Sequence, residues 1–152
     1  MLNISHRGNL YGQDKNRENN PKAIEECIIK GLDVEIDICI VNGKPFLGHD
    51  EPEHEISYNY LNDLSDNLWV HCKDYEALIF CQDSPNINYF THDNDQYTLT
   101  SKNFIWSHPK NGPIERAINV MPEKYLKSTD AKHFNAYLDC LGICTDIIGK
   151  LT

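Results

Sequence analysis

Short apolar runs alternate with polar, turn-rich segments along the whole chain. Runs that are rich in β-branched and aromatic residues predict strands. They are found at 2–5, 32–41, 44–50, 68–72, 87–90, 104–107, 117–121 and 142–148. Asn42-Gly43 lies between the second and third runs, and this dipeptide predicts a tight β-hairpin.

Helical patterns lie between some of these strands. Pro21 begins a segment with apolar residues on one face, and Gly31 ends it. A shorter helix is expected over 75–80. Asp130 is placed to cap a third helix, whose apolar stripe consists of Phe134, Leu138 and Leu141.

The alternation of strands and helices predicts an α/β fold with a parallel sheet or barrel. A complete barrel of this kind takes about 250 residues, and this chain has 152. The predicted strands at 104–107 and 117–121 are joined by a short segment, whereas a helical crossover needs at least about 10–12 residues. We therefore expect a trimmed TIM-like (β/α) barrel with about seven to eight parallel strands and several helices missing, forming one domain over 1–152.

Composition narrows the class of protein. Hydrophobic residues make up 40% and charged residues 24%, values typical of a globular chain. The net charge of −9 argues against a nucleic-acid binder, because phosphate contacts need clustered cations. No apolar run approaches the roughly 18 residues that a transmembrane helix needs, so we expect no transmembrane helix. The N-terminus does not resemble a signal peptide. The six cysteines form no CxxC pair, so we expect reduced thiols in a cytoplasmic protein.

Glu35 and Asp37 are two carboxylates within one apolar strand. Their spacing of two places them on the same face. Such a pair repels unless a cation lies between its members, and oxygen ligands suit Mg²⁺, Ca²⁺ or Mn²⁺. Alternatively, both residues lie on the solvated face of an edge strand, with Val34, Ile36 and Ile38 in the core. The spacing leaves both interpretations open.

An ordered set of motifs resembles the glycerophosphodiester phosphodiesterase family and the related phosphatidylinositol-phospholipase-C-like barrels. The motifs are His6-Arg7-Gly8, Glu18-Asn19, Glu35-x-Asp37 and His49-Asp50, and they span roughly the first fifty residues. The C-terminal GICTDIIGKL (142–151) also resembles the family's last strand and turn.

The resemblance implies a role for each matched residue. His6 and His49 would be the acid/base pair, and Arg7 and Lys73 would bind the substrate phosphate. Glu35 and Asp37 would be metal ligands, supported by Glu18. We also regard Asp50, next to His49, and His92, at the end of a strand, as supporting residues of the same site.

The chain departs from the family at the third strand. The usual Glu-x-Lys is replaced by His71-Cys72-Lys73, which makes His71 the third candidate ligand. The family metal would be Mg²⁺ or Ca²⁺, whereas an imidazole weakens binding of these hard cations and favours Mn²⁺ or Zn²⁺. The replacement of the carboxylate by His71 is also consistent with loss of the metal site.

These residues predict a metal-dependent phosphodiester hydrolase that acts on a small phosphodiester by two-histidine acid/base catalysis. One alternative is a non-catalytic relative that binds a phosphorylated, sugar or sugar-phosphate ligand, or serves as an interaction module, with a link to surface-polysaccharide metabolism. Another is a sugar-phosphate modifying enzyme that performs related chemistry on a glycan precursor. A barrel stripped of helices would expose apolar surface, so we expect a homodimer that covers it.

Overall fold

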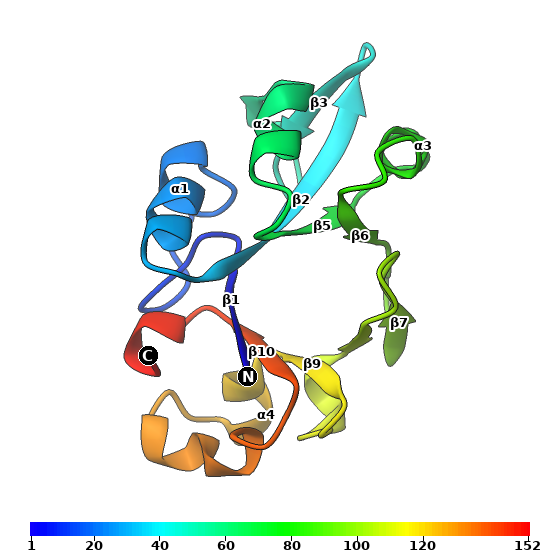
Figure 1. The fold of residues 1–152 in the computed structure, drawn as a ribbon. Helices are drawn as coiled ribbons and strands as arrows, with labels where there is room; N and C mark the ends of the chain where they lie inside the picture. The colour runs from blue at the N-terminus through cyan, green and yellow to red at the C-terminus, as the bar shows by residue number, and fades with distance from the viewer.

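The computed structural model describes residues 1–152 and is organised around one ten-stranded sheet (Figure 1). The strands are β1 (Leu2–His6), β2 (Asp33–Val41), β3 (Lys44–Leu47), β4 (His54–Glu55), β5 (Leu68–Cys72), β6 (Asn88–Phe90), β7 (Tyr97–Leu99), β8 (Ile105–Ser107), β9 (Ala117–Val120) and β10 (Gly142–Thr145). The α-helices are α1 (Pro21–Ile29), α2 (Tyr58–Asp63), α3 (Tyr75–Gln82) and α4 (Pro122–Leu126). Three short 3-10 helices complete the fold: η1 (Pro109–Asn111), η2 (Ala131–Tyr137) and η3 (Ile148–Lys150).

Strand pairing in the sheet is mixed. Parallel pairs join β6 to β5, β5 to β2, β2 to β1, β1 to β10, β10 to β9 and β9 to β8. Antiparallel pairs join β2 to β3, β3 to β4 and β7 to β8. The sheet curls round on itself, and β6 and β7 face each other without forming a strand pair (Figure 1).

The prediction of a trimmed TIM-like barrel of parallel strands is therefore wrong. The structure is an open, curled sheet with antiparallel additions and few helices. Connection length explains the difference. A parallel pair needs a long crossover, but β2 and β3 are joined by a two-residue turn, and β7 and β8 by a short turn. Such short connections can only return the chain antiparallel.

The hairpin predicted at Asn42-Gly43 is confirmed. Both residues have positive φ, at 51° and 76°, and Val41 pairs with Lys44 across the turn. Two positive φ values in a two-residue loop are typical of a type I′ turn, whose twist matches that of the strands it joins.

The helix predicted from Pro21 is also confirmed. Pro21 occupies its first turn, and the Asn20 side chain accepts a hydrogen bond from the Lys22 N–H as the cap. The third predicted helix is wrong in type, because residues 131–137 form the 3-10 helix η2. Asp130 does cap it, but only Phe134 of the expected apolar stripe is buried, because Leu138 is 60% and Leu141 38% exposed.

Strand alternation sends side chains to two separate apolar clusters. The larger cluster packs the outer face of the sheet against α1, α2 and α3, and it includes Val34, Ile36 and Ile38 of β2. The smaller lies on the inner face and consists of Ile4, Trp69, Phe90, Trp106, Ile118, Val120 and Cys144. On β2 the inner face belongs to Glu35 and Asp37, which are 3% and 0% exposed. The alternative of a solvated edge strand is therefore wrong for these carboxylates.

Two further expectations concern the whole chain. All six cysteines are free thiols in the structure, as predicted. None of the helices has the length and apolar character needed to cross a bilayer.

Candidate functional site

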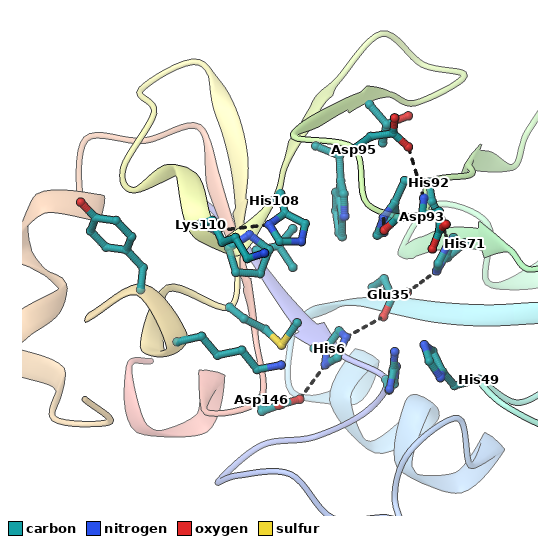
Figure 2. A pocket seen from close by; sticks show the side chains of 18 of the residues that line it. His6, Glu35, His49, His71, His92, Asp93, Asp95, His108, Lys110 and Asp146 are labelled. Carbon is teal, nitrogen blue, oxygen red and sulfur yellow. Dashed lines mark hydrogen bonds and ion pairs between the residues drawn. The ribbon is translucent and has the colours of Figure 1, made fainter. Parts of the chain in front are cut away.

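A cavity of about 830 Å³ opens where the parallel strands end, and polar side chains from both halves of the chain line it (Figure 2). Five of the seven histidines of the chain lie in its lining: His6, His49, His71, His92 and His108. Imidazole is the side chain whose proton affinity is closest to neutrality. The concentration of histidines at one cavity marks it as the candidate site.

His6 ends β1 and is held by Asp146, which follows β10. The His6 Nδ1 lies 2.7 Å from Asp146 Oδ1, and both residues are buried. Burial lowers the pKa of His6, but the hydrogen bond to Asp146 and the charge of Glu35 outweigh it, so the pKa is raised. Burial raises the pKa of Asp146, but the hydrogen bond from His6 and other neighbouring groups together lower it by more, so the pKa of Asp146 falls below its usual value. An ionised carboxylate only accepts, so Nδ1–H donates and the Nε2 atom of His6 is left for chemistry.

His49 forms a second histidine–aspartate pair at the same cavity. Its Nδ1 lies 2.6 Å from Oδ1 of the exposed Asp50. The bond to His49 lowers the pKa of Asp50, so this carboxylate also accepts the Nδ1 proton. The Nε2 atom of His49 is thereby left as its free ring nitrogen.

Glu35, Asp37 and His71 form a buried cluster beside these pairs. One oxygen or nitrogen from each lies within 4.8 Å of the others. His71 Nδ1 is 2.9 Å from Asp37 Oδ1 and 4.0 Å from Glu35 Oε1. Burial and the neighbouring Asp37 raise the pKa of Glu35, and its buried Oε2 has no hydrogen-bond partner. The cluster therefore holds a carboxylate oxygen without a hydrogen bond, and the nearest cationic group to it is His6, whose Nε2 lies 3.8 Å away.

The ring of His71 is held by two neighbouring aromatic rings and at its far nitrogen. It stacks on His92 with ring centroids 4.5 Å apart and on Phe90 at 5.3 Å. Its Nε2 lies 3.3 Å from the His92 carbonyl oxygen, which can only accept a proton. Burial and His71 lower the pKa of His92 to about 4, so His92 is neutral at pH 7. The His71 Nδ1 is thus directed at two carboxylates.

Asp37 is surrounded by donors. Its Oδ2 lies 2.9 Å from Arg7 Nε and accepts a hydrogen bond from Asn19 Nδ2, while Lys73 Nζ lies 4.0 Å from Oδ1. Burial raises the pKa of Asp37, but the bond from His71 and the Arg7 charge hold it well below its usual value. Arg7 itself has a left-handed backbone (φ 55°), and Glu18 lies 3.6 Å from its guanidinium. Strain of this kind is typical of functional sites.

The donor set fits a divalent cation. Glu35 Oε2 lacks a partner, and the ring nitrogen of His71 faces two carboxylates while its other nitrogen bonds a backbone carbonyl. A ligating histidine is commonly oriented in this way by a carbonyl or carboxylate behind it. The mixture of two carboxylates and one imidazole suits Mn²⁺ or Zn²⁺ better than an all-oxygen cluster would.

The structure brings the ten residues predicted for the site together. Seven of them line the cavity: His6, Arg7, Glu35, His49, His71, Lys73 and His92. Asp37 lies behind the wall in contact with Arg7 and His71, Glu18 lies beside Arg7, and Asp50 pairs with His49. Their individual roles remain predictions.

Several residues of the site were not predicted. Asp146 was missed as the partner of His6, Asn19 as the partner of Asp37, and His108, Lys110 and Lys124 as lining residues. Asp146 carries the same signal as the others, a polar side chain just after an apolar strand. The lysines had no comparable signal, because their place depends on how two loops pack.

No family model, curated protein or solved structure matches the chain. Function is therefore inferred from the motifs and from the geometry of this cavity. Fold likeness alone would not have fixed the chemistry in any case.

Proposed function

We propose that the protein is a metal-dependent phosphodiester hydrolase that acts on a small phosphodiester. The observation that carries the proposal is the pairing of two imidazoles with two carboxylates at one cavity. His6 with Asp146 and His49 with Asp50 share that cavity with Arg7 and Lys73. General acid/base catalysis of phosphoryl transfer needs two proton-exchanging groups around an anion held by cations.

Arg7 and Lys73 are the groups that bind the phosphodiester in this proposal. Both line the cavity, and Asp37 lies within ion-pair distance of each. Asp37 and Glu18 orient the Arg7 guanidinium, so its remaining N–H groups are presented to an anion at little entropic cost. A divalent cation held by Glu35, Asp37 and His71 would supply further positive charge against the developing phosphorane.

The two histidines exchange protons through their Nε2 atoms. One Nε2 accepts the proton of the attacking hydroxyl, either water or a neighbouring hydroxyl of the substrate, as the new P–O bond forms. The other donates its proton to the leaving alcohol as the old P–O bond breaks. Asp146 and Asp50 keep each ring in the tautomer that leaves Nε2 for this exchange.

A binding role without turnover is the second candidate. Both oxygens of Asp37 and both ring nitrogens of His71 already lie against protein groups. A cluster whose ligand atoms already have partners in the protein gains less from binding a metal than a cluster whose ligand atoms are free. In that case the cavity would hold a phosphorylated or sugar ligand through Arg7 and Lys73.

Turnover by matched histidine variants separates the two candidates. The purified protein is assayed with bis-(p-nitrophenyl) phosphate and glycerophosphodiesters in Mg²⁺, Ca²⁺ and Mn²⁺. We expect metal-dependent hydrolysis that falls by about a hundredfold or more in His6→Ala and in His49→Ala. His133→Ala removes an exposed histidine outside the cavity and should leave the rate unchanged.

The outcomes are distinct. Unchanged turnover in either cavity variant would remove that histidine from the mechanism. A lack of turnover with every metal and diester would favour the binding role, and calorimetric titration with the same diesters would then measure the binding directly.

A further inference from the structure

We propose that the cavity contains a second anion-binding subsite formed by Lys110 and Lys124. The substrate would then be a phosphodiester that carries another anionic group, a phosphate or a carboxylate, on one of its alcohols. This inference rests on the proposed function, because it names the substrate class of the same cavity.

The cavity has room for such a substrate. Its volume of about 830 Å³ lies within the range of roughly 300–1,000 Å³ that accommodates drug-sized ligands, well beyond what a lone phosphodiester group fills. His49 and His71 lie on one side of it, and His108 and Lys110 lie on the other (Figure 2). Lys110 therefore lies across the cavity from His49, whereas Lys124 lies nearer to His6, because its charge helps to lower the pKa of Asp146, the partner of His6. We call the part of the lining that Lys110 and Lys124 form the lysine wall.

Lys110 and Lys124 are cations without carboxylate partners. Neither forms an ion pair in the structure, whereas Arg7 and Lys73 both lie within 4.0 Å of Asp37. Three lysines line the cavity, and Lys110 and Lys124 are the two that have no ion pair. Unpaired cations beside a cavity attract an anionic ligand and fix its orientation.

The backbone that presents Lys124 is anchored to the reaction centre. Its neighbour Glu123 accepts hydrogen bonds from Thr145 Oγ1 at 2.6 Å and from the Asp146 N–H at 3.2 Å. Met121, just before α4, has a left-handed backbone (φ 44°) ahead of Pro122, and its N–H donates to the Cys144 carbonyl. This strained turn pins the start of α4 to the end of β10, which also carries Asp146.

Lys110 lies in the 3-10 helix η1, which packs on α4. Its backbone N–H donates to Nδ1 of His108, and Asn111 Nδ2 donates to the Gln96 carbonyl at 2.6 Å. Gly112 follows, and a Cβ there would lie 2.9 Å from the ring of Tyr125 on α4. The two helices α4 and η1 therefore form one packed unit that holds both lysines.

The other side chains of the cavity agree with this division. Its two exposed carboxylates, Asp93 and Asp95, follow β6 beside His92, so an added anion is directed to the lysine wall instead. Trp106, Val120 and Met121 provide apolar lining for the carbon skeleton of the alcohol.

Calorimetric titration with paired probes tests the subsite. The probes are propyl phosphate and a series of α,ω-alkanediol bisphosphates of increasing linker length, titrated in the same Mg²⁺ buffer. We expect one linker length to bind about tenfold more tightly than propyl phosphate, as one additional charge-assisted contact predicts. Lys110→Ala/Lys124→Ala should abolish this advantage and leave the affinity for propyl phosphate unchanged.

A matched control removes a lysine elsewhere. Lys102 is exposed in the turn between β7 and β8 and does not line the cavity, so Lys102→Ala should keep the full advantage. Propyl phosphate binding with no tighter bisphosphate, or an advantage that survives in the double variant, would overturn the subsite and leave the hydrolase proposal standing. An absence of binding by both probes would overturn both. Binding does not depend on turnover, so the two failures are distinguishable.

Discussion

The two histidine–aspartate pairs differ in their surroundings although their hydrogen bonds are alike. Asp146 and His6 are buried, whereas Asp50 is exposed and His49 is half-buried. A buried ionic hydrogen bond is stronger than an exposed one, because water does not screen it. The proton affinity of His6 therefore depends strongly on the charge of its buried carboxylate.

Replacing Asp146 should consequently change both the rate of hydrolysis and its pH dependence. Asp146→Asn preserves size and an oxygen that can accept from His6 Nδ1, but it removes the charge that raises the pKa of His6. We expect kcat to fall by about a hundredfold or more. Because the pKa of His6 falls, the limb of the pH–rate profile that reports it should shift to lower pH, whichever proton transfer His6 performs.

The measurement is kcat as a function of pH for the wild type, for Asp146→Asn and for Asp50→Asn. Asp50→Asn is the exposed counterpart and should lose less activity, because water screens its charge. A profile of Asp146→Asn that does not shift would show that His6 is not the titrating group.

At the residue scale, strand alternation and strand ends identified much of the site. Glu35 and Asp37 were correctly predicted to share a face, and polar residues at other strand ends meet them at the cavity. The contacts between residues that are far apart in the sequence could not be predicted. His6 and Asp146 are 140 positions apart, and only the pairing of β1 with β10 brings them together.

At the element scale, the turn after β3 determines where His49 lies. Gly48 has φ 150°, and a Cβ there would collide with the carbonyl oxygen of Glu51. The added Cβ would collide with a backbone atom and not with the end of a flexible side chain, so the turn itself would have to shift. The turn can therefore present His49 and Asp50 only with glycine at this position.

Gly48→Ala should lower both stability and turnover. We expect the free energy of unfolding to fall by about 1–3 kcal/mol, and kcat to fall because His49 is displaced. Urea unfolding and a turnover assay measure the two effects. Gly12→Ala is the matched control, since Gly12 has φ 144° but no atom lies within 4 Å of the position that a Cβ would take there. Equal effects in the two variants would show that the contact with Glu51 does not position the turn.

Element type was easier to predict than element pairing. Asn42-Gly43 requires a hairpin, because both residues accept positive φ, and the cap and proline at 20–21 require a helix start. The turn at Asn42-Gly43 predicted that β3 pairs antiparallel with β2, but the pattern of apolar residues gave no sign that β4 and β7 also pair antiparallel with their neighbours. The alternation of apolar and polar residues shows which face of a strand is buried, but it does not show which strand lies next to it. The number of parallel strand pairs was therefore overestimated.

At the scale of the whole molecule, the buried carboxylates couple the site to folding. Glu35 is almost fully buried beside Asp37, and one of its oxygens has no partner. Its pKa is raised in the folded state, so its contribution to stability is greatest at acidic pH and is lost as the pH rises through that pKa. Ionisation of Glu35 in the metal-free protein is therefore unfavourable.

Glu35→Gln should accordingly reverse its effect on stability when metal is added. In EDTA at neutral pH the variant should match or exceed the wild type by about 1 kcal/mol, because an uncompensated buried charge is gone. In Mn²⁺ at a hundredfold excess over its dissociation constant, the wild type should gain about 2.7 kcal/mol, since the metal binds only the folded state. The variant should gain much less, because it lacks one ligand, and the order of stabilities should invert.

Urea unfolding in EDTA and in Mn²⁺ measures all four free energies. Glu53→Gln removes an exposed carboxylate outside the cavity and should follow the wild type in both buffers. An equal gain from Mn²⁺ in Glu35→Gln and the wild type would mean that Glu35 does not hold the metal. A less stable Glu35→Gln in EDTA would mean that Glu35 is neutral in the folded protein and donates a hydrogen bond. Because the inversion compares each protein with itself in two buffers, a general loss of stability in the variant cannot produce it.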